Sequence, residues 1–162
     1  MNKKFELLEF LENTGIQDVE QIAAMLDSSP EVIRNEIKAF EKEGVILGYQ
    51  TMIDWDKAGK EYVSAFIELK VSPQIDEGFD AIAGKIYEYP EVKSVYLMSS
   101  AKYDLLLNIE GRTFRDVAYF VAYKLAPLEN IVSTATHFVL KKYKDKGVIF
   151  GESLVDEREN VL

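Results

Sequence analysis

The chain has 162 residues, 48% of them hydrophobic, and a formal net charge of −9, so it can form two small cores or one medium core. It contains no cysteine and one histidine, His137, which excludes disulfides, thiolate metal sites and clustered-histidine metal sites within one chain. Neither a signal-peptide segment nor a run of about 18 apolar residues occurs, and we therefore expect a cytoplasmic protein that does not contact membranes.

Residues 1–54 have the pattern of three helices followed by a short hairpin. In residues 3–13, apolar side chains recur at three- to four-residue steps, which is typical of one face of a helix. Asp18 is a favourable N-cap for a second helix. Ser29 is suited to cap a third helix, because Pro30 then takes the first helical position, where its missing N–H costs nothing.

The third predicted helix has one apolar and one polar side. Its apolar stripe comprises Ile33, Ile37 and Phe40. On the other side, asparagine can bond adenine edges, and arginine and lysine suit guanine or phosphate. The candidate DNA-contacting residues, including the cap and the flank of the helix, are Ser29, Glu31, Arg34, Asn35, Lys38 and Lys42. A solvated face of a small helical domain is the alternative interpretation.

After this helix, Gly44 predicts a left-handed helix end. Residues 45–54 are predicted to form two short strands that turn near Leu47 and Gly48, and residues 55–61 form a polar linker. Three helices and such a hairpin make a winged helix-turn-helix, a module that usually places one helix in the major groove of DNA.

The predicted head, residues 1–54, is acidic, since it has five basic and eleven acidic residues and a net charge of −6. A DNA-binding head normally shows a basic footprint. We therefore expect a narrow basic stripe and weak affinity per head, with avidity from several heads making up the difference.

Residues 62–146 follow a different pattern. The predicted strands are 62–71, 92–98, 103–109 and 131–143, and the predicted helices are 75–88 and one capped by Thr113 with Asp116. This order is the ferredoxin-like βαββαβ motif of the α+β class. Its helices cover one face of the sheet, yet the strands are apolar on both faces, which predicts a dimer through the sheet. Residues 147–162 are an acidic tail, in which residues 148–150 either dock on a neighbour or fray.

Over nearly the whole chain, the order and spacing of these features resemble the Lrp/AsnC ("feast/famine") transcriptional regulators. The matching segments are Ser29-Pro30, Gly44-Val45-Ile46, Gly48-Tyr49, Pro90-Glu91-Val92, Tyr103-Asp104-Leu105 and Ser133-Thr134-Ala135-Thr136-His137. The resemblance implies a sequence-specific DNA-binding regulator, with an N-terminal winged helix-turn-helix followed by a ferredoxin-like βαββαβ domain of the RAM type. It also implies dimers that assemble further, into octamers built as tetramers of dimers.

The same resemblance implies an amino-acid effector that binds between neighbouring dimers. In the family its cleft lies around the loop before the third strand of this domain and the start of the last strand. The corresponding residues are Ser99, Ser100, Ala101, Tyr103, Asp104, Thr134 and Thr136. A carboxylate such as Asp104 is suited to pair an ammonium group, while hydroxyl and backbone N–H groups hold a carboxylate. In the alternative interpretation, Asp104 caps the hairpin turn and the threonines belong to the sheet.

No catalytic dyad, phosphate-binding glycine loop or metal-ligand spacing occurs in the sequence, so we expect neither an enzyme nor a cofactor. One alternative is an enzyme, because siroheme decarboxylases resemble the same two-domain architecture. That chemistry calls for a cluster of arginine and histidine, whereas this chain has one histidine and, outside the head, Arg112, Arg115 and Arg158. A second alternative is an assembly scaffold whose DNA-binding role has decayed, which the acidic head would suit.

Overall fold

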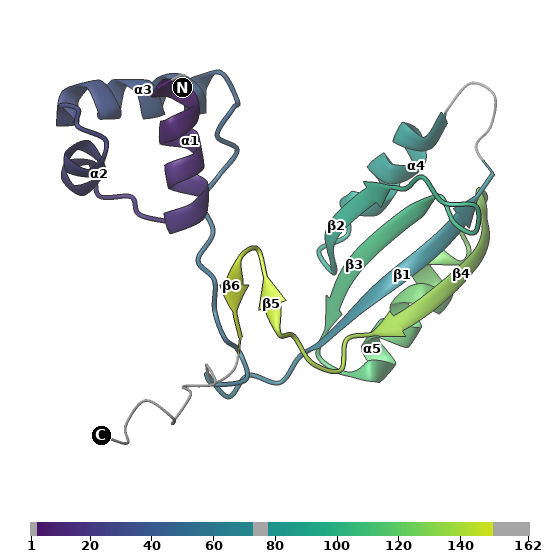
Figure 1. Ribbon diagram of the computed structural model, residues 1–162. Helices are drawn as coiled ribbons and strands as arrows, with labels where there is room; N and C mark the ends of the chain where they lie inside the picture. Colours follow the sequence, from purple (N-terminus) through teal and green to yellow (C-terminus); the bar gives the residue numbers. More distant parts are fainter. Residues whose placement is uncertain (1–2, 73–77, 151–162) are drawn as a thin grey trace. The chain divides into compact units, whose positions relative to one another are not determined.

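The computed structural model describes residues 3–72 and 78–150 (Figure 1). The chain divides into two compact units. The head unit comprises the described residues up to Ile53 together with those from Lys144 onward, and the sheet unit runs from Asp54 to Tyr143. In the described ranges, none of the helices has the length and apolar composition needed to cross a membrane.

Three helices form the head unit: α1 (Lys3–Thr14), α2 (Val19–Met25) and α3 (Pro30–Lys42). The caps begin two of them as predicted, because the Asp18 carboxylate accepts from the backbone N–H groups of Glu20 and Gln21, and Ser29 Oγ accepts from that of Val32. The helices enclose a small apolar core made of Leu7, Ile22, Ala23, Ile33 and Phe40.

The end of α3 is also as predicted. Gly44 has a φ of 71°, a left-handed conformation that glycine adopts without steric cost. The N–H of Val45 donates to the carbonyl of Phe40 at 2.8 Å, and that of Gly44 donates to Glu41 at 3.2 Å. These two hydrogen bonds define a Schellman motif, which satisfies the last carbonyls of the helix.

The two short strands predicted over residues 45–54 are wrong, since no strand lies between α3 and Val63 in the structure. A tight two-residue hairpin needs a positive φ at its turn, and Gly48 does not adopt one. The head unit instead carries a hairpin of β5 (Lys144–Asp145) and β6 (Val148–Ile149). Its turn residues, Lys146 and Gly147, have φ values of 44° and 83°, as a type I′ turn requires.

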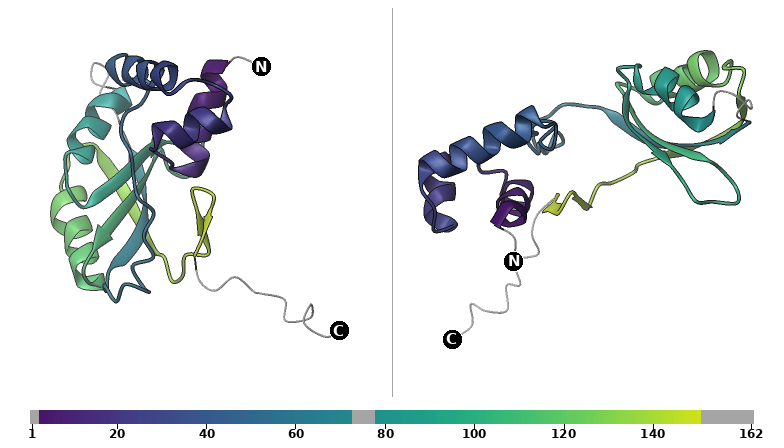
Figure 2. Two further views of the ribbon diagram at one scale, coloured as in Figure 1. Left: turned by 90° about the vertical axis from the view of Figure 1, so that its left-hand side faces the viewer. Right: turned by 90° about the horizontal axis from the view of Figure 1, so that it is seen from above.

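The sheet unit contains β1 (Val63–Val71), β2 (Val92–Leu97), β3 (Leu105–Gly111) and β4 (Ile131–Phe138) in the order β2-β3-β1-β4, with every neighbouring pair antiparallel. The helices α4 (Gly78–Tyr87) and α5 (Phe114–Phe120), the latter continued by the π-helical turn η1 (Val121–Leu125), lie on one face of the sheet (Figure 2). This confirms the predicted ferredoxin-like fold. Of the predicted helix 75–88, residues 75–77 lie outside the described residues.

The main core lies between the sheet and these helices. Alternate residues of β1 and β3 face the helices and are fully or nearly fully buried, as expected from the two-residue period of strands. The buried residues are Ala65, Ile67, Leu69, Val71, Ile82, Ile86, Leu105, Leu107, Ile109, Val117, Phe120 and Leu125. Thr113 and Asp116 form the predicted capping box of α5, with hydrogen bonds of 3.0 and 3.1 Å.

The last strand of the sheet is shorter than predicted, because β4 ends at Phe138 rather than at residue 143. Its partner β1 begins at Val63. The register pairs Phe138 with Ala65, and the N–H of Val139 still donates to the carbonyl of Ser64 at 2.9 Å. Hydrogen bonding to β1 therefore continues one residue beyond the end of β4.

Candidate DNA and effector sites

The polar side of α3 is the candidate DNA surface. Ile33 and Phe40 are buried against the other head helices and Ile37 is half-buried, so the opposite side of α3 faces solvent. The predicted DNA-contacting residues all lie in or beside this helix and are all exposed; they are Ser29, Glu31, Arg34, Asn35, Lys38 and Lys42. The structure thus places the predicted DNA-contacting residues on α3 and its N-cap, a helix with hydrogen-bonded caps at both ends.

One contact on this surface was not foreseen from the sequence. The guanidinium of Arg34 lies 3.7 Å from the Glu20 carboxylate of α2, and both side chains are exposed. The pair joins the two helices of the helix-turn-helix at the candidate DNA surface. Helix periodicity places each residue on its own helix, but it cannot say which side chains meet across two helices.

The segment after α3 is tied to the head by side chains. Tyr49 Oη donates to Glu41 Oε1 at 3.0 Å, and burial together with the nearby Glu41 carboxylate raises the pKa of Tyr49. Lys146 Nζ of the β5–β6 turn donates to Gln50 Oε1 at 2.8 Å. A shallow hollow of about 210 Å³ lies beside Tyr49, lined by Leu11, Gln17, Val19, Ile37, Glu41 and Tyr49.

The predicted effector residues lie toward one end of the sheet, except Thr136, which is opposite the middle of β1, and they are not all on one side of the sheet. Ser99, Ser100, Ala101, Tyr103 and Asp104 belong to the connection between β2 and β3, and Thr134 and Thr136 belong to β4. In the register, Thr134 lies opposite Leu69 and Thr136 lies opposite Ile67. Cross-strand partners share a face of the sheet, so both threonines point toward the helix-covered face, whereas Ser133, Ala135 and His137 point the other way.

Asp104 is separated from these threonines by the width of β1. The N–H of Asp104 donates to the carbonyl of Leu69, whose cross-strand partner on the other side is Thr134. Two strand spacings amount to about 10 Å. A single small ligand that contacted both Asp104 and Thr134 would therefore have to reach across the end of β1.

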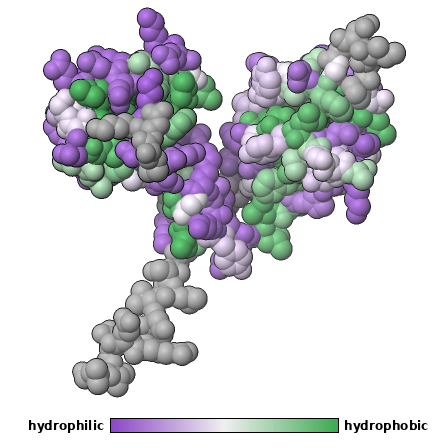
Figure 3. Space-filling model, turned by 45° about the horizontal axis from the view of Figure 1, so that its top comes forward, coloured by the Kyte–Doolittle hydropathy of each residue, from purple (hydrophilic) through white to green (hydrophobic). Residues whose placement is uncertain are grey.

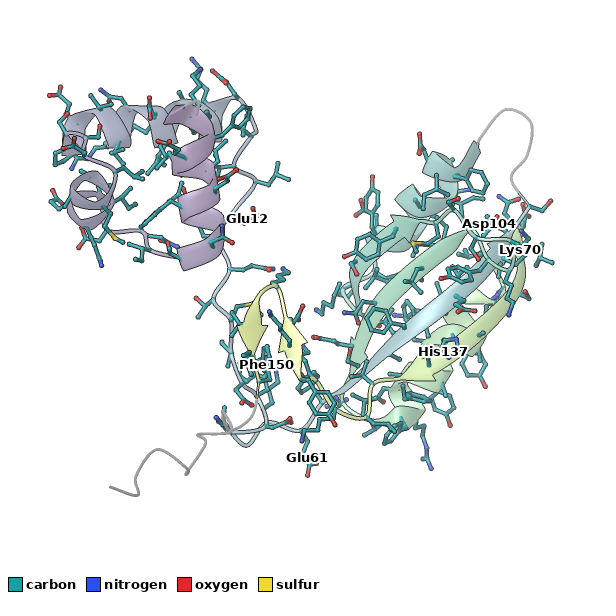
Figure 4. The ribbon with its side chains drawn as sticks, in the orientation of Figure 1. Glu12, Glu61, Lys70, Asp104, His137 and Phe150 are labelled. Atoms are coloured by element: carbon teal, nitrogen blue, oxygen red, sulfur yellow. The ribbon has the colours of Figure 1, made fainter. Side chains whose placement is uncertain are left out.

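The Asp104 carboxylate is already engaged within this chain (Figure 4). Its Oδ2 accepts from the backbone N–H of Val71 at 3.0 Å, and its Oδ1 accepts from Lys70 Nζ at 3.1 Å. The hydrogen bond from Val71 is the larger cause, and Lys70 the smaller one, of a lowered pKa at Asp104. Lys70 is the functional candidate that sequence reasoning missed; the only signal was its polar position in an alternating strand.

The lowered pKa of Asp104 gives a prediction about stability and pH. The ionised carboxylate stabilises the fold fully above its ordinary pKa of about 3.9, and this stabilisation is lost as the pH falls through the lowered value. We expect Asp104→Asn to reduce the free energy of unfolding by about 1–2 kcal/mol at neutral pH. Urea unfolding from neutral to acid pH would measure the difference from wild type, which should shrink below about pH 4. A difference that stays constant over that range would contradict the assignment.

The face of the sheet opposite α4 and α5, called here the open face, is not covered by any helix of the described sheet unit (Figure 1). Phe66 of β1 and Tyr96 of β2 are exposed on it, and Leu106 of β3 is half-buried. Polar pairs lie among them: Ser64 Oγ donates to Asn108 Oδ1 at 3.0 Å, and His137 Nε2 lies 3.4 Å from Glu68 Oε1. Figure 3, which views this side obliquely, shows hydrophobic residues among polar ones.

In residues 3–72 and 78–150, no group of three or more histidine, aspartate or glutamate side chains is placed to hold a metal ion. Charged groups of the described sheet unit form several pairs, among them Lys70 with Asp104 and Lys124 with Glu91.

The chain is similar to known transcriptional regulators over most of its length. A family model described as the Lrp/AsnC ligand binding domain matches residues 64–149. An uncharacterized HTH-type transcriptional regulator of Bacillus subtilis, YugG, is 46% identical over 157 residues, which cover 96% of this chain and 94% of that protein. The HTH-type transcriptional regulator LrpA of Pyrococcus horikoshii is 27% identical over 138 residues, covering 85% of this chain and 94% of that protein.

A solved structure shares the fold. It is a transcriptional regulator from Neisseria meningitidis in complex with L-Met, with a TM-score of 0.72 at 20% identity, covering 90% of this chain and 92% of that chain.

Proposed function

Because this chain belongs to the Lrp/AsnC family of transcriptional regulators, we propose that it regulates transcription by binding double-stranded DNA through the exposed side of α3. The observation that carries this proposal is the placement of Arg34, Asn35 and Lys38 on the solvent side of a capped helix whose other side is buried. In a helix-turn-helix, the second helix enters the major groove and the first crosses the backbone; α3 and α2 take these roles here. Because its target is DNA, we place the protein in the cytoplasm.

Each polar residue of α3 has a role that follows from its chemistry. Asn35 is suited to bond an adenine edge, and Arg34, Lys38 and Lys42 suit phosphate or guanine. Ser29 holds the start of the helix through its hydrogen bond to the N–H of Val32. The net charge of −6 over residues 1–54 limits the affinity of one head, so useful affinity depends on several heads that bind one DNA molecule.

A dimer would supply a second head. The open face carries the exposed Phe66 and Tyr96 and the half-buried Leu106, and a second copy of the same face is the partner that a two-fold dimer provides. Two heads about one helical turn of DNA apart, near 34 Å, would then read a pseudo-palindrome. Further assembly of dimers into octamers would multiply the avidity.

Lys38→Ala tests the DNA surface. If Lys38 neutralises a phosphate, its loss should weaken binding to all sequences alike and reduce the slope of log affinity against log salt by about one unit per contact. Fluorescence anisotropy with duplex DNA at several salt concentrations would measure both quantities. An unchanged affinity and slope in a folded variant would reject the assignment and favour the scaffold alternative.

An amino-acid effector at the end of the sheet is the second part of the proposal. The relative from Neisseria meningitidis was solved with L-Met, and the predicted residues here offer one carboxylate and several hydroxyl groups, as a zwitterion requires. Since Lys70 and Val71 already hold Asp104, an ammonium group would have to displace or share Lys70. The hydroxyl of Ser100, at the same loop, accepts from the N–H of Lys102 at 3.2 Å.

Thermal-shift measurements with the twenty amino acids test this part. A ligand at about one hundred times its Kd stabilises the native state by about 2.7 kcal/mol, so the cognate amino acid should raise the melting temperature clearly. The same ligand should raise it less in Asp104→Asn than in wild type. If no amino acid acts on the wild type, the effector is of another class; if Asp104→Asn responds equally, the site exists but Asp104 does not anchor it.

A further inference from the structure

The ion pair between Arg34 and Glu20 links a candidate DNA-contacting side chain to an acidic one on the neighbouring helix. Arg34 Nη2 lies 3.7 Å from Glu20 Oε1, and the side chains are 48% and 73% exposed. Arg34 stands one position after the buried Ile33 on α3, at the flank of the surface that also carries Asn35 and Lys38. The guanidinium is therefore held on the α2 side of that surface by a carboxylate.

The start of α2 is unsuited to contact phosphate, because Glu20 is acidic and because the N–H groups there are already bonded. In a helix-turn-helix the first helix crosses the DNA backbone, and free N–H groups at its start would favour a phosphate. Here the Asp18 carboxylate accepts from the N–H groups of Glu20 and Gln21 at 3.0 and 3.2 Å. Asp18 and Glu20 thus place two negative charges at the start of α2, the helix that crosses the DNA backbone in a helix-turn-helix.

We propose that Glu20 competes with DNA phosphate for the guanidinium of Arg34 and thereby sets the affinity of each head. The inference rests on the proposed DNA-binding role of α3. In the free protein Arg34 pairs with Glu20. On DNA, Arg34 must leave that carboxylate or share it with a phosphate, and the carboxylate repels the same phosphate. Each head consequently binds weakly, and only sites that engage two or more heads at once are occupied.

The test compares Glu20→Gln with Glu12→Gln in the full chain. Both variants remove one negative charge from the head, but Glu12 is an exposed residue of α1 (Figure 4) and is not the partner of Arg34. Binding to a fluorescent duplex of mixed sequence, about three helical turns long, is measured by anisotropy from about 50 to 200 mM salt. Circular dichroism checks that each variant is folded.

Glu20→Gln should tighten binding by about two- to five-fold for each head, the range expected of an exposed ion pair, and by the square of that factor when two heads engage one duplex. The salt slope should steepen by about 0.9 per head as Arg34 gains a phosphate. Glu12→Gln should show only the smaller effect of a distant charge, since separated exposed charges are screened. In the Arg34→Ala background, Glu20→Gln should lose its specific gain, as a double-mutant cycle requires.

Three results would overturn the inference: a gain no larger than that of Glu12→Gln, a gain that persists without Arg34, or a loss of affinity, which would make Glu20 a positioning residue for Arg34. Lys38→Ala separates this failure from a failure of the proposed function. If Lys38→Ala weakens binding while Glu20→Gln behaves as its control, α3 is the DNA surface and only the competition is wrong. If Lys38→Ala has no effect, the DNA surface is misplaced and the inference falls with it.

Discussion

Leu106→Asp is expected to convert the protein from a dimer into a folded monomer. Leu106 lies near the middle of the open face, where the register places it beside Glu68 of β1 and Tyr96 of β2. In a dimer through this face, the new carboxylate would be removed from water without a cationic partner. Leaving a buried charge uncompensated costs about 3–5 kcal/mol, which corresponds to a dissociation constant raised by at least about a hundred-fold.

Analytical ultracentrifugation at micromolar concentration would measure this change. Tyr123→Asp is a matched control, because Tyr123 is an exposed residue of η1, on the helix-covered side of the sheet. Leu106→Asp should sediment as a monomer with native circular dichroism, whereas Tyr123→Asp should keep the sheet-to-sheet dimer. A wild-type protein that is a stable folded monomer under these conditions, or a Leu106→Asp variant that remains dimeric, would show that the open face is not the interface.

Ile67→Ala is expected to give the largest loss of stability within the sheet unit. Ile67 is 0% exposed and lies on β1 between β3 and β4, facing the helices. Removing its buried methyl and methylene groups loses their transfer free energy and leaves a cavity, which together cost about 2–5 kcal/mol for this substitution. The loss should appear as a lower midpoint of urea unfolding with little change in slope.

Leu140→Ala is the matched control for Ile67→Ala. Leu140 is also an aliphatic residue of the sheet unit but is 91% exposed, so its replacement should change stability by less than about 0.5 kcal/mol. The proteins must be compared at one concentration, because dimerisation makes apparent stability depend on concentration. Equal losses in the two variants would mean that Ile67 does not lie in a packed core.

The sequence by itself determined the features that depend on a few neighbouring residues. Asp18, Ser29 with Pro30, and Thr113 with Asp116 mark helix starts, because a side chain caps N–H groups only two or three residues away. Gly44 marks a helix end for the same local reason. The two-residue period identified the strands of the main sheet, and their order with the helices led to the ferredoxin-like fold. All of these features can be predicted from neighbouring residues, without knowledge of any contact between distant parts of the chain.

Only the tertiary structure decided features that depend on distant residues. The end of β4 at Phe138 does not show in its own sequence pattern, and the faces of Thr134 and Thr136 follow from their register with β1. The partners of Arg34 and Asp104 lie on other elements, and neither partner shows in the local pattern. A strand or an ion pair between separate elements requires the register and packing of both, and those are set by the whole core rather than by the residues next to them in the chain.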